Sequence, residues 1–352
     1  MSFDNEERAA LRSSVRGLLA KHSDSAAVRR AMTTEHGYDE ALWSRLCDQI
    51  GVAALAVPEK YGGVGASLLE IHVVQEELGR TLTPSPMLGS AVLATQALVL
   101  SGDVDACSRL LPTIAEGAVA ALCWADSNGW SNVGVTASGD TLSGTASYVL
   151  GADIAEVLLV LTSDGLYQVD PSSDGVHRRR LPTMDPTRSL SEVSFDAAAA
   201  RRIESPPDLV EQVRTIALIA LSAEQVGAAS AALEMTVAYT KARTQFGRSI
   251  GSFQALKHRM ADMYVSVEAA RSMSCAAALS GTHEDAVAAK ICCSEALQHV
   301  AAETIQMHGG IAITWDHDAQ LFFKRAHGAA QLFGLPRDYL TDPACWPRQD
   351  FV

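Results

Sequence analysis

Two short segments in the C-terminal half of the chain carry side chains suited to binding a phosphate-containing cofactor. The first is Arg243-Thr244-Gln245-Phe246-Gly247-Arg248, followed closely by Phe253 and Gln254. The second is Gln306-Met307-His308-Gly309-Gly310. An arginine presents a planar fork of donors that matches a pyrophosphate or ribose oxygen, and paired glycines let a backbone approach a bulky cofactor closely. The alternative is structural: the arginine would form an ion pair at a helix end, and the glycines would end a helix.

Other segments contain residues that could bind a metal ion or a phosphate, but their spacing does not fit such a site. Trp315-Asp316-His317-Asp318 places two carboxylates beside a histidine, but adjacent side chains on an ordered backbone diverge, so no metal site is predicted. Gly62-Gly63-Val64-Gly65 lacks the Gly-Lys-Ser/Thr ending of a phosphate-binding loop and is predicted to be a turn. The seven cysteines are odd in number and scattered, which predicts reduced core residues.

The composition is that of a globular protein with an acidic balance. Of 352 residues, 48% are hydrophobic and 20% are charged, and 41 acidic against 28 basic residues give a net charge of −13. This charge disfavours non-specific binding to nucleic acid or to an anionic membrane. The first residues lack the basic and apolar regions of a signal peptide, and no stretch is expected to reach the roughly 18 to 20 apolar residues that span a bilayer. We therefore expect a cytoplasmic protein.

The two cofactor-type segments need a scaffold, and the spacing of apolar residues changes twice along the chain. Residues 1–118 show helical spacing, as for Leu42 and Leu46. Residues 119–205 contain short apolar runs separated by Gly, Asp and Ser, which predicts a small middle β domain. Residues 206–352 return to long helical stripes, which predicts a bundle of about four helices. The predicted fold class is α+β, with an N-terminal helical domain, a middle β domain and a C-terminal four-helix bundle.

Four motifs, in this order of parts, resemble the acyl-CoA dehydrogenase family over nearly the whole chain. Two lie in the N-terminal part: Ala56 to Gly65 (AVPEKYGGVG) and Gln75 to Arg80 (QEELGR). The other two are the cofactor-type segments described above. The resemblance implies FAD as the cofactor and the α,β-dehydrogenation of an acyl-CoA thioester as the reaction. Any one of these glycine-rich pieces alone would be a weak signal.

The resemblance also implies a set of cofactor-binding residues that act across a subunit interface. They would touch the adenosine and pyrophosphate part of an FAD held mainly by a neighbouring subunit. These residues are Arg243, Gln245, Phe246, Phe253, Gln254, Gln306, Gly309 and Gly310.

The sequence departs from the family where the reaction takes place. In the family, a glutamate takes the α-proton of the acyl group while the flavin takes a hydride from the β-carbon. The two positions used for that base fall here on Ala217 and Gly334, and neither is a carboxylate. Segments that hold the flavin ring in the family are replaced by Trp124 to Asn132 and by Tyr148-Val149-Leu150. The resemblance therefore implies that this chain has no catalytic base and a weakened site for the flavin ring.

This combination is similar to that of the heteromeric acyl-CoA dehydrogenases of actinobacterial steroid side-chain degradation. In those enzymes two related chains form an α2β2 assembly with fewer flavins than subunits, and one chain supplies the base. The resemblance implies a related acyl-CoA dehydrogenase subunit as partner in a heterotetramer. It also implies a fatty acyl-CoA or steroid side-chain acyl-CoA as substrate and an electron-transferring flavoprotein as electron acceptor.

Two alternatives stay open. The chain could be a self-sufficient homotetramer with an unconventional base, for which Glu211, Glu224 and Asp338 are the nearest candidates in sequence. Glu224 lies about 10 Å from Ala217 along a helix axis, at 1.5 Å per residue, so it cannot simply replace a base there. The chain could also be a flavin-free structural paralogue, because folds persist when functions are lost.

Overall fold

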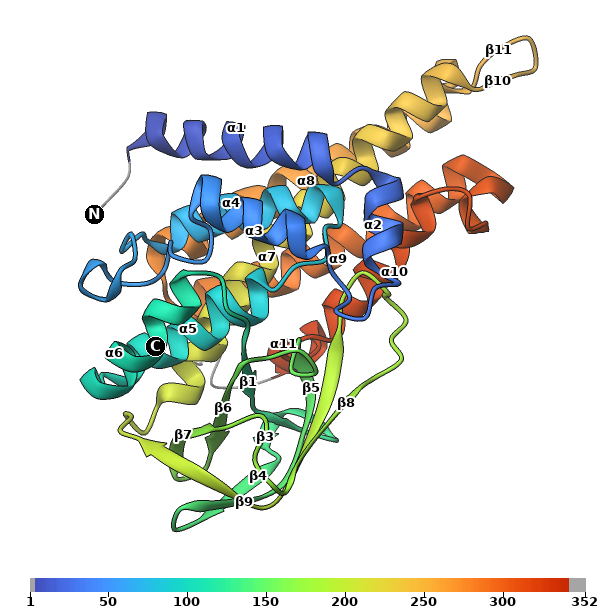
Figure 1. The fold of residues 1–352 in the computed structure, drawn as a ribbon. Helices are drawn as coiled ribbons and strands as arrows, with labels where there is room; N and C mark the ends of the chain where they lie inside the picture. Colours follow the sequence, from blue (N-terminus) through green and yellow to red (C-terminus); the bar gives the residue numbers. More distant parts are fainter. Residues whose placement is uncertain (1–3, 342–352) are drawn as a thin grey trace, which may run out of the picture.

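The computed structural model describes residues 4–341, and its helices, strands and helices follow one another as predicted (Figure 1). The N-terminal elements are α1 (Asn5–His22), α2 (Ser25–Ala31), α3 (Glu40–Ile50), η1 (Glu59–Tyr61), α4 (Leu68–Thr81), η2 (Met87–Ala94), α5 (Thr95–Ser101) and α6 (Val104–Ala115). The C-terminal elements are α7 (Leu209–Ala242), β10 (Thr244–Gln245), β11 (Arg248–Ser249), η3 (Ile250–Ser252), α8 (Gln254–Ser280), α9 (His283–His308), η4 (Gly309–Ile313), α10 (Ala319–Gln331) and α11 (Pro336–Thr341). The α+β fold class is therefore confirmed, although α10 is much shorter than α7, α8 and α9.

A twisted sheet lies on one side of the helices (Figure 1). Its strands, together with a separate short β2–β3 pair, are β1 (Ala120–Cys123), β2 (Ala125–Asp126), β3 (Gly129–Val133), β4 (Val135–Ser138), β5 (Thr141–Leu150), β6 (Val157–Thr162), β7 (Gly165–Val169), β8 (Val176–Arg180) and β9 (Leu190–Ile203). The order is β1-β6-β7-β9-β5-β4, with β8 also on β9, and among the strands of residues 4–341 only β1 and β6 pair in parallel. β6 is buried along its whole length, because helices cover one face of the sheet and a second apolar cluster fills the other.

Helix α7 runs through the centre of the molecule. By length and composition it could cross a membrane, which contradicts the expectation that no stretch is so apolar. However, 94% of its apolar stretch is buried inside the protein, so it is a core helix. Two glycines let α4 and α7 cross in backbone contact: a Cβ atom would lie 2.1 Å from the Glu224 carbonyl oxygen at Gly79, and 1.9 Å from the Glu76 carbonyl oxygen at Gly227. Any larger residue at either position would force the two helices apart.

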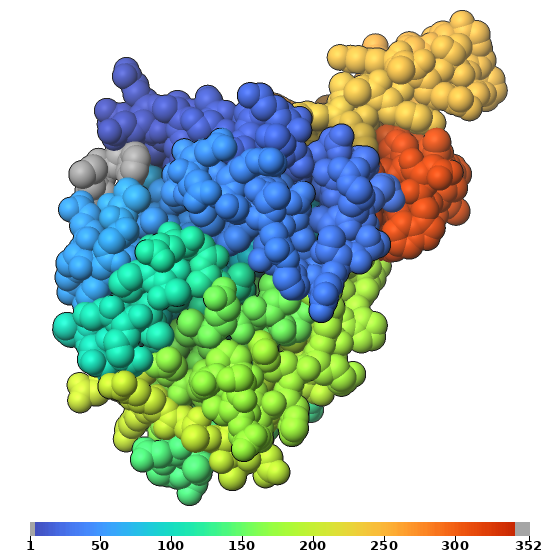
Figure 2. Space-filling view, viewed as in Figure 1, coloured from blue at the N-terminus to red at the C-terminus, as the bar shows by residue number. Residues whose placement is uncertain are grey.

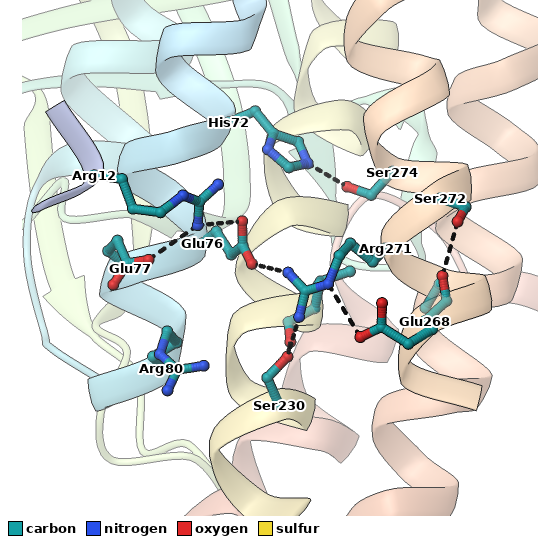
Figure 3. A network of polar contacts seen from close by, with 12 residues as sticks. Arg12, His72, Glu76, Glu77, Arg80, Ser230, Glu268, Arg271, Ser272 and Ser274 are labelled. Carbon is teal, nitrogen blue, oxygen red and sulfur yellow. Dashed lines mark hydrogen bonds and ion pairs between the residues drawn. The ribbon is translucent and has the colours of Figure 1, made fainter. Parts of the chain in front are cut away.

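Helix α4 buries three carboxylates and is neutralised by arginines from other helices. Glu70, Glu76 and Glu77 are almost completely buried. Arg8, Arg12 and Arg16 lie on one face of α1, at intervals of four residues, and pair with them. Figure 3 shows Arg12 between Glu76 and Glu77, at 2.7 and 3.0 Å, with Arg271 of α8 on the other side of Glu76.

These ion pairs outweigh the cost of burying Glu76. Burial by itself raises the pKa of its carboxyl, but Arg12 and Arg271 oppose this and hold the pKa below its usual value. The carboxylate therefore stays charged, and α1 and α8 are both fixed to α4 through it.

We expect Arg12→Ala to lower the free energy of unfolding by about 1.5 to 3 kcal/mol, because it leaves two buried carboxylates with one arginine fewer each. Arg179→Ala is the matched control: Arg179 is 65% exposed and pairs with Glu192 on the surface. Such a pair is worth roughly 0 to 1 kcal/mol. Urea denaturation of both variants checks this, and equal losses would contradict the proposed role of Arg12.

Candidate functional site

The structure brings the two cofactor-type segments together at one end of the helical bundle. Tyr239, near the end of α7, stacks on His308 of α9 with ring centroids 4.2 Å apart. Its hydroxyl donates to the carbonyl oxygen of His308 at 3.3 Å. Arg259 near the start of α8 pairs with Glu303 near the end of α9. The residues before Gly309 are thus packed beside the helix end that leads to Arg243.

We call the end of α7, the β10–β11 hairpin and the start of α8 the arm. The arm stands clear of the rest of the molecule, with the hairpin at its tip (Figures 1 and 2). The hairpin is held by β-pairing of Thr244 with Ser249, and the Ile250 amide donates to the Arg243 carbonyl oxygen at 2.8 Å. The ring of Phe253 lies under the guanidinium of Arg248 at 3.9 Å and at right angles to the ring of Phe246.

Most of the predicted cofactor-binding residues are exposed on or beside the arm. Phe246 is 89% exposed, a large value for a phenylalanine. The side chains of Arg243, Gln245, Gln254 and Gln306 are exposed, and within residues 4–341 none of them has a hydrogen-bond or ion-pair partner. A Cβ atom at Gly309 or Gly310 would meet nothing within 4 Å, so these glycines face open space. The structural alternative of an ion pair for Arg243 finds no support in these contacts.

A cavity of about 430 Å³ lies between the sheet side and the end of α10. Its wall contains residues from the two segments that replace the family's flavin-ring segments, and it also contains one of the two base positions. They are Asn128, Gly129, Trp130, Ser131, Tyr148 and Gly334, together with Met184, Asp185, Arg188 and Asp338 among others. The second base position, Ala217, is fully buried in α7 and is not in this wall.

The backbone conformation at Gly334 disfavours a side chain. Its φ of +110° disfavours any residue other than glycine, and the preceding Phe333 is also left-handed at +62°. A Cβ atom at Gly334 would lie 3.1 Å from the hydroxyl oxygen of Tyr339. That hydroxyl donates to the carbonyl oxygen of Phe333, so Tyr339 is fixed in this place. A glutamate at position 334 would therefore strain the backbone of this turn and press on the side chain of Tyr339.

The three other candidate bases have different surroundings. Glu211 is exposed and pairs with Arg214 at 3.2 Å. Glu224 is buried between Arg188 and Arg325, so its carboxylate is already engaged. Asp338 is exposed, lines the cavity and accepts a hydrogen bond from the Leu335 amide at 3.2 Å.

The Trp315 to Asp318 segment and the cysteines, for which the sequence predicted no metal or redox site, have structural roles. Asp318 accepts hydrogen bonds from Ser25 and Arg29 and thereby fixes the start of α10 to α2. Lys324 lies 3.9 Å above the ring of Trp315. The six described cysteines are free, and burial raises the pKa of Cys123 to about 12. Cys345 lies outside the described residues.

Lys290 of α9 is an important residue that the sequence reasoning missed. It is fully buried, and its Nζ donates to the carbonyl oxygens of Ala329, Ala330 and Leu332 at 3.1, 3.2 and 2.9 Å. Carbonyls at a helix C-terminus lack intrahelical partners, so Lys290 satisfies three groups at the end of α10. It thereby positions the turn that contains Gly334. The only available signal was a single charge within the apolar run AVAAKICC (residues 286–293).

The chain also matches known protein families and individual proteins. The family model "Acyl-CoA dehydrogenase, N-terminal domain" matches residues 5–118, and "Acyl-CoA dehydrogenase, C-terminal domain" matches residues 216–334. The chain is 44% identical to acyl-CoA dehydrogenase IpdE2 of Mycobacterium tuberculosis over 336 residues, which are 95% of each chain.

Two similar solved structures are named as pairs of chains. One is the Tcur3481-Tcur3483 steroid ACAD G363A variant, with a TM-score of 0.86, 31% identity and coverage of 95% of both chains. The other is the ChsE4-ChsE5 complex from Mycobacterium tuberculosis, with a TM-score of 0.87, 26% identity and coverage of 96% of both chains.

Lys290→Met tests the anchoring of the turn, because it keeps the apolar stem and removes all three donors. We expect it to lower the free energy of unfolding by roughly 2 to 4 kcal/mol, since buried carbonyls lose their partners. Lys257→Met, at an exposed position of α8, is the control.

The effect of Lys290→Met on the free energy of unfolding should also depend on pH. Burial, with a smaller effect of Arg188, lowers the pKa of Lys290 to about 7 from its usual value of 10.5. Between these two pH values the unfolded chain holds the extra proton, so this group makes the folded state more stable as the pH rises. The difference in unfolding free energy between the parent protein and Lys290→Met should therefore grow from pH 7 to pH 9. A difference that is independent of pH would contradict this account.

Proposed function

The chain belongs to the acyl-CoA dehydrogenase family, and we propose that it is a subunit of a mixed, FAD-dependent acyl-CoA dehydrogenase that lacks a catalytic glutamate of its own. In this proposal its arm completes the FAD site of a related partner subunit in a heterotetramer. One observation carries the proposal: the residues predicted to contact the FAD of a neighbouring subunit are present and most of them are exposed, whereas neither base position holds a carboxylate.

The arm suits the outer part of an FAD molecule. Arg243 would donate to pyrophosphate oxygens, as a charge-assisted contact. Gln245, Gln254 and Gln306 would donate to phosphate, ribose or adenine atoms, and Phe246 and Phe253 would cover the adenosine. Gly309 and Gly310 leave open space for a bulky group to approach the backbone. Free donors and an exposed aromatic ring on and beside the arm support a ligand that is held mainly by another chain.

The reaction also needs a base. FAD, when bound, accepts the hydride that leaves the β-carbon of the acyl thioester. The proton on the α-carbon must go to a group within hydrogen-bond reach. Ala217 is buried and has no proton acceptor, and Gly334 has no side chain and a backbone conformation that disfavours one. In this proposal a carboxylate of the partner subunit takes the proton.

The similar proteins support the kind of partner and substrate. ChsE4-ChsE5 and Tcur3481-Tcur3483 are each named as two chains, which supports a related but different subunit as partner. One of them is named a steroid ACAD, which supports a steroid side-chain acyl-CoA over a simple fatty acyl-CoA. We further propose that an electron-transferring flavoprotein accepts the electrons and that the assembly works in the cytoplasm.

A self-sufficient homotetramer is the second candidate. Asp338 favours it, because this carboxylate lines the cavity that Gly334 also borders. Against it, Asp338 is exposed, so water competes for its proton-accepting oxygens, and Glu224 is held by two arginines. A flavin-free structural paralogue is less well supported, because such a protein has no chemical need for free donors on the arm.

We expect Arg243→Ala to weaken FAD retention by the mixed assembly roughly tenfold to a hundredfold, because a charge-assisted contact of about 1.5 to 3 kcal/mol is lost. Lys241→Ala is the matched control, because it removes the same charge two residues earlier at another exposed position. Flavin absorbance per mole of complex after gel filtration measures the effect. Unchanged flavin content with Arg243→Ala would contradict a contact across the interface.

A further inference from the structure

Three aromatic rings meet where the two cofactor-type segments come together. Tyr239 of α7 stacks on His308 of α9, and His317, between η4 and α10, lies on the other side of them. The ring centroid of His317 is 4.6 Å from that of His308 and 6.3 Å from that of Tyr239. His308 is almost completely buried, whereas Tyr239 and His317 are half-buried. We call these three side chains the ring stack.

The ring stack closes the segment 309–316 at both of its ends. His308 precedes this segment and His317 follows it, so the contact between their rings holds the segment as a loop. Tyr239 belongs to the arm, and its hydroxyl donates to the carbonyl oxygen of His308. The stack therefore sets the position of the paired glycines in this segment relative to the arm.

The hydrogen bonds of the two imidazoles fit neutral rings. Nδ1 of His308 lies 2.7 Å from the carbonyl oxygen of Thr304 and therefore carries a proton that it donates. Nδ1 of His317 accepts a hydrogen bond from the Ala319 amide at 3.1 Å. Nε2 of His308 is buried and has no hydrogen-bond partner within residues 4–341. A second proton on His308 would thus be a buried donor without an acceptor.

The groups around His308 do not compensate such a charge. The titratable side chains stacked on its ring are Tyr239 and His317. Charged side chains on the adjoining parts of the chain are engaged elsewhere or exposed: Glu303 pairs with Arg259 of α8, Asp318 pairs with Arg29 of α2, Lys324 of α10 lies over Trp315, and Lys241 and Asp316 are exposed.

A proton on His308 therefore opposes the stacked arrangement. Burial lowers the pKa of His308 below its usual value of 6.5, and His317 adds to this, while the hydrogen bond to Thr304 opposes it. A ring that leaves the stack for water binds a proton more readily than the stacked ring. A pH below about 6.5 consequently favours release of the ring, and a higher pH favours the stack.

We propose that Tyr239, His308 and His317 form a proton-sensitive latch that positions the segment 309–316 for the FAD of the partner subunit. This inference rests on the proposed function and extends it: the mixed assembly retains FAD less well when His308 takes up a proton and its ring leaves the stack. His308 is a positioning residue, because it acts through the two glycines that follow it.

The first test compares the affinity of the purified mixed assembly for FAD at about pH 7.5 and about pH 5.5, by titration of flavin fluorescence. Through this group the dissociation constant should rise by up to about tenfold at the lower pH, the most that one pH unit below the usual pKa allows. His308→Phe keeps a ring for stacking and removes the site of the proton, so the rise should be smaller by that factor. His299→Phe, at an exposed position of the same helix, should keep the rise of the parent assembly.

The second test observes the latch without FAD. Hydrogen–deuterium exchange of the segment 309–316 is measured on this chain alone at the same two pH values and corrected for the intrinsic pH dependence of exchange. We expect more exchange at the lower pH in the parent chain and no such increase in His308→Phe, because only the parent ring can be protonated.

Two results would overturn the latch. One is a dissociation constant for FAD that changes equally with pH in the parent and His308→Phe assemblies. The other is corrected exchange of the segment 309–316 that is the same at both pH values in the parent chain. If His308→Phe does not assemble, His308→Gln also lacks a group that titrates, and the same outcomes apply.

The same samples separate this inference from the proposed function. Equal pH dependence in parent and His308→Phe, with FAD affinity still weakened by Arg243→Ala, contradicts only the latch. FAD affinity that responds neither to pH nor to Arg243→Ala contradicts the proposed function, and the exchange measurement then decides whether the latch itself exists.

Discussion

A buried ion cluster around Arg325 joins the C-terminal helical bundle to the middle β domain. Arg325 of α10 donates to Asp185 at 2.6 Å, to Glu224 of α7 at 2.7 Å and to the carbonyl oxygen of Thr187 at 3.1 Å. Arg188, which like Asp185 precedes β9, also pairs with Glu224. Burial alone would raise the pKa of Asp185, but Arg325 and Arg188 outweigh it and lower the pKa. Two cations and two anions balance one another, which makes their burial tolerable.

This cluster also helps to position the turn that contains Gly334. It fixes α10 against both α7 and the sheet side, and Lys290 then fixes the end of α10. The turn through Phe333 and Gly334 is thus held at both ends, with the ring of Phe333 packed on Trp130 and Gly334 in the wall of the 430 Å³ cavity. Neither base position in the interior of this chain holds a carboxylate, while the unpaired donors lie outside, on and beside the arm. This division of features is what a subunit that completes another chain's site requires.

The sequence predicted what depends on local pattern. The apolar stripe of α8 is one example, because Met263 and Val267 are buried as helical spacing requires. Contacts between distant residues were not predictable in this way. Arg325 and Asp185 are 140 residues apart, and nothing in the local pattern indicates their pairing. The apolar stretch of α7 was also missed, because a charged residue such as Glu224 interrupts it in the sequence, whereas in the structure Glu224 is buried and paired with Arg325, which lies far away in the chain.

The central claim is that this chain completes the flavin site of a different chain and holds no flavin alone. The most direct measurement is to express the chain by itself and together with a related acyl-CoA dehydrogenase chain, and to record molar mass and flavin absorbance on one gel-filtration column. The account predicts a colourless chain alone and a yellow heterotetramer when both are present. A yellow homotetramer of this chain alone would contradict the account.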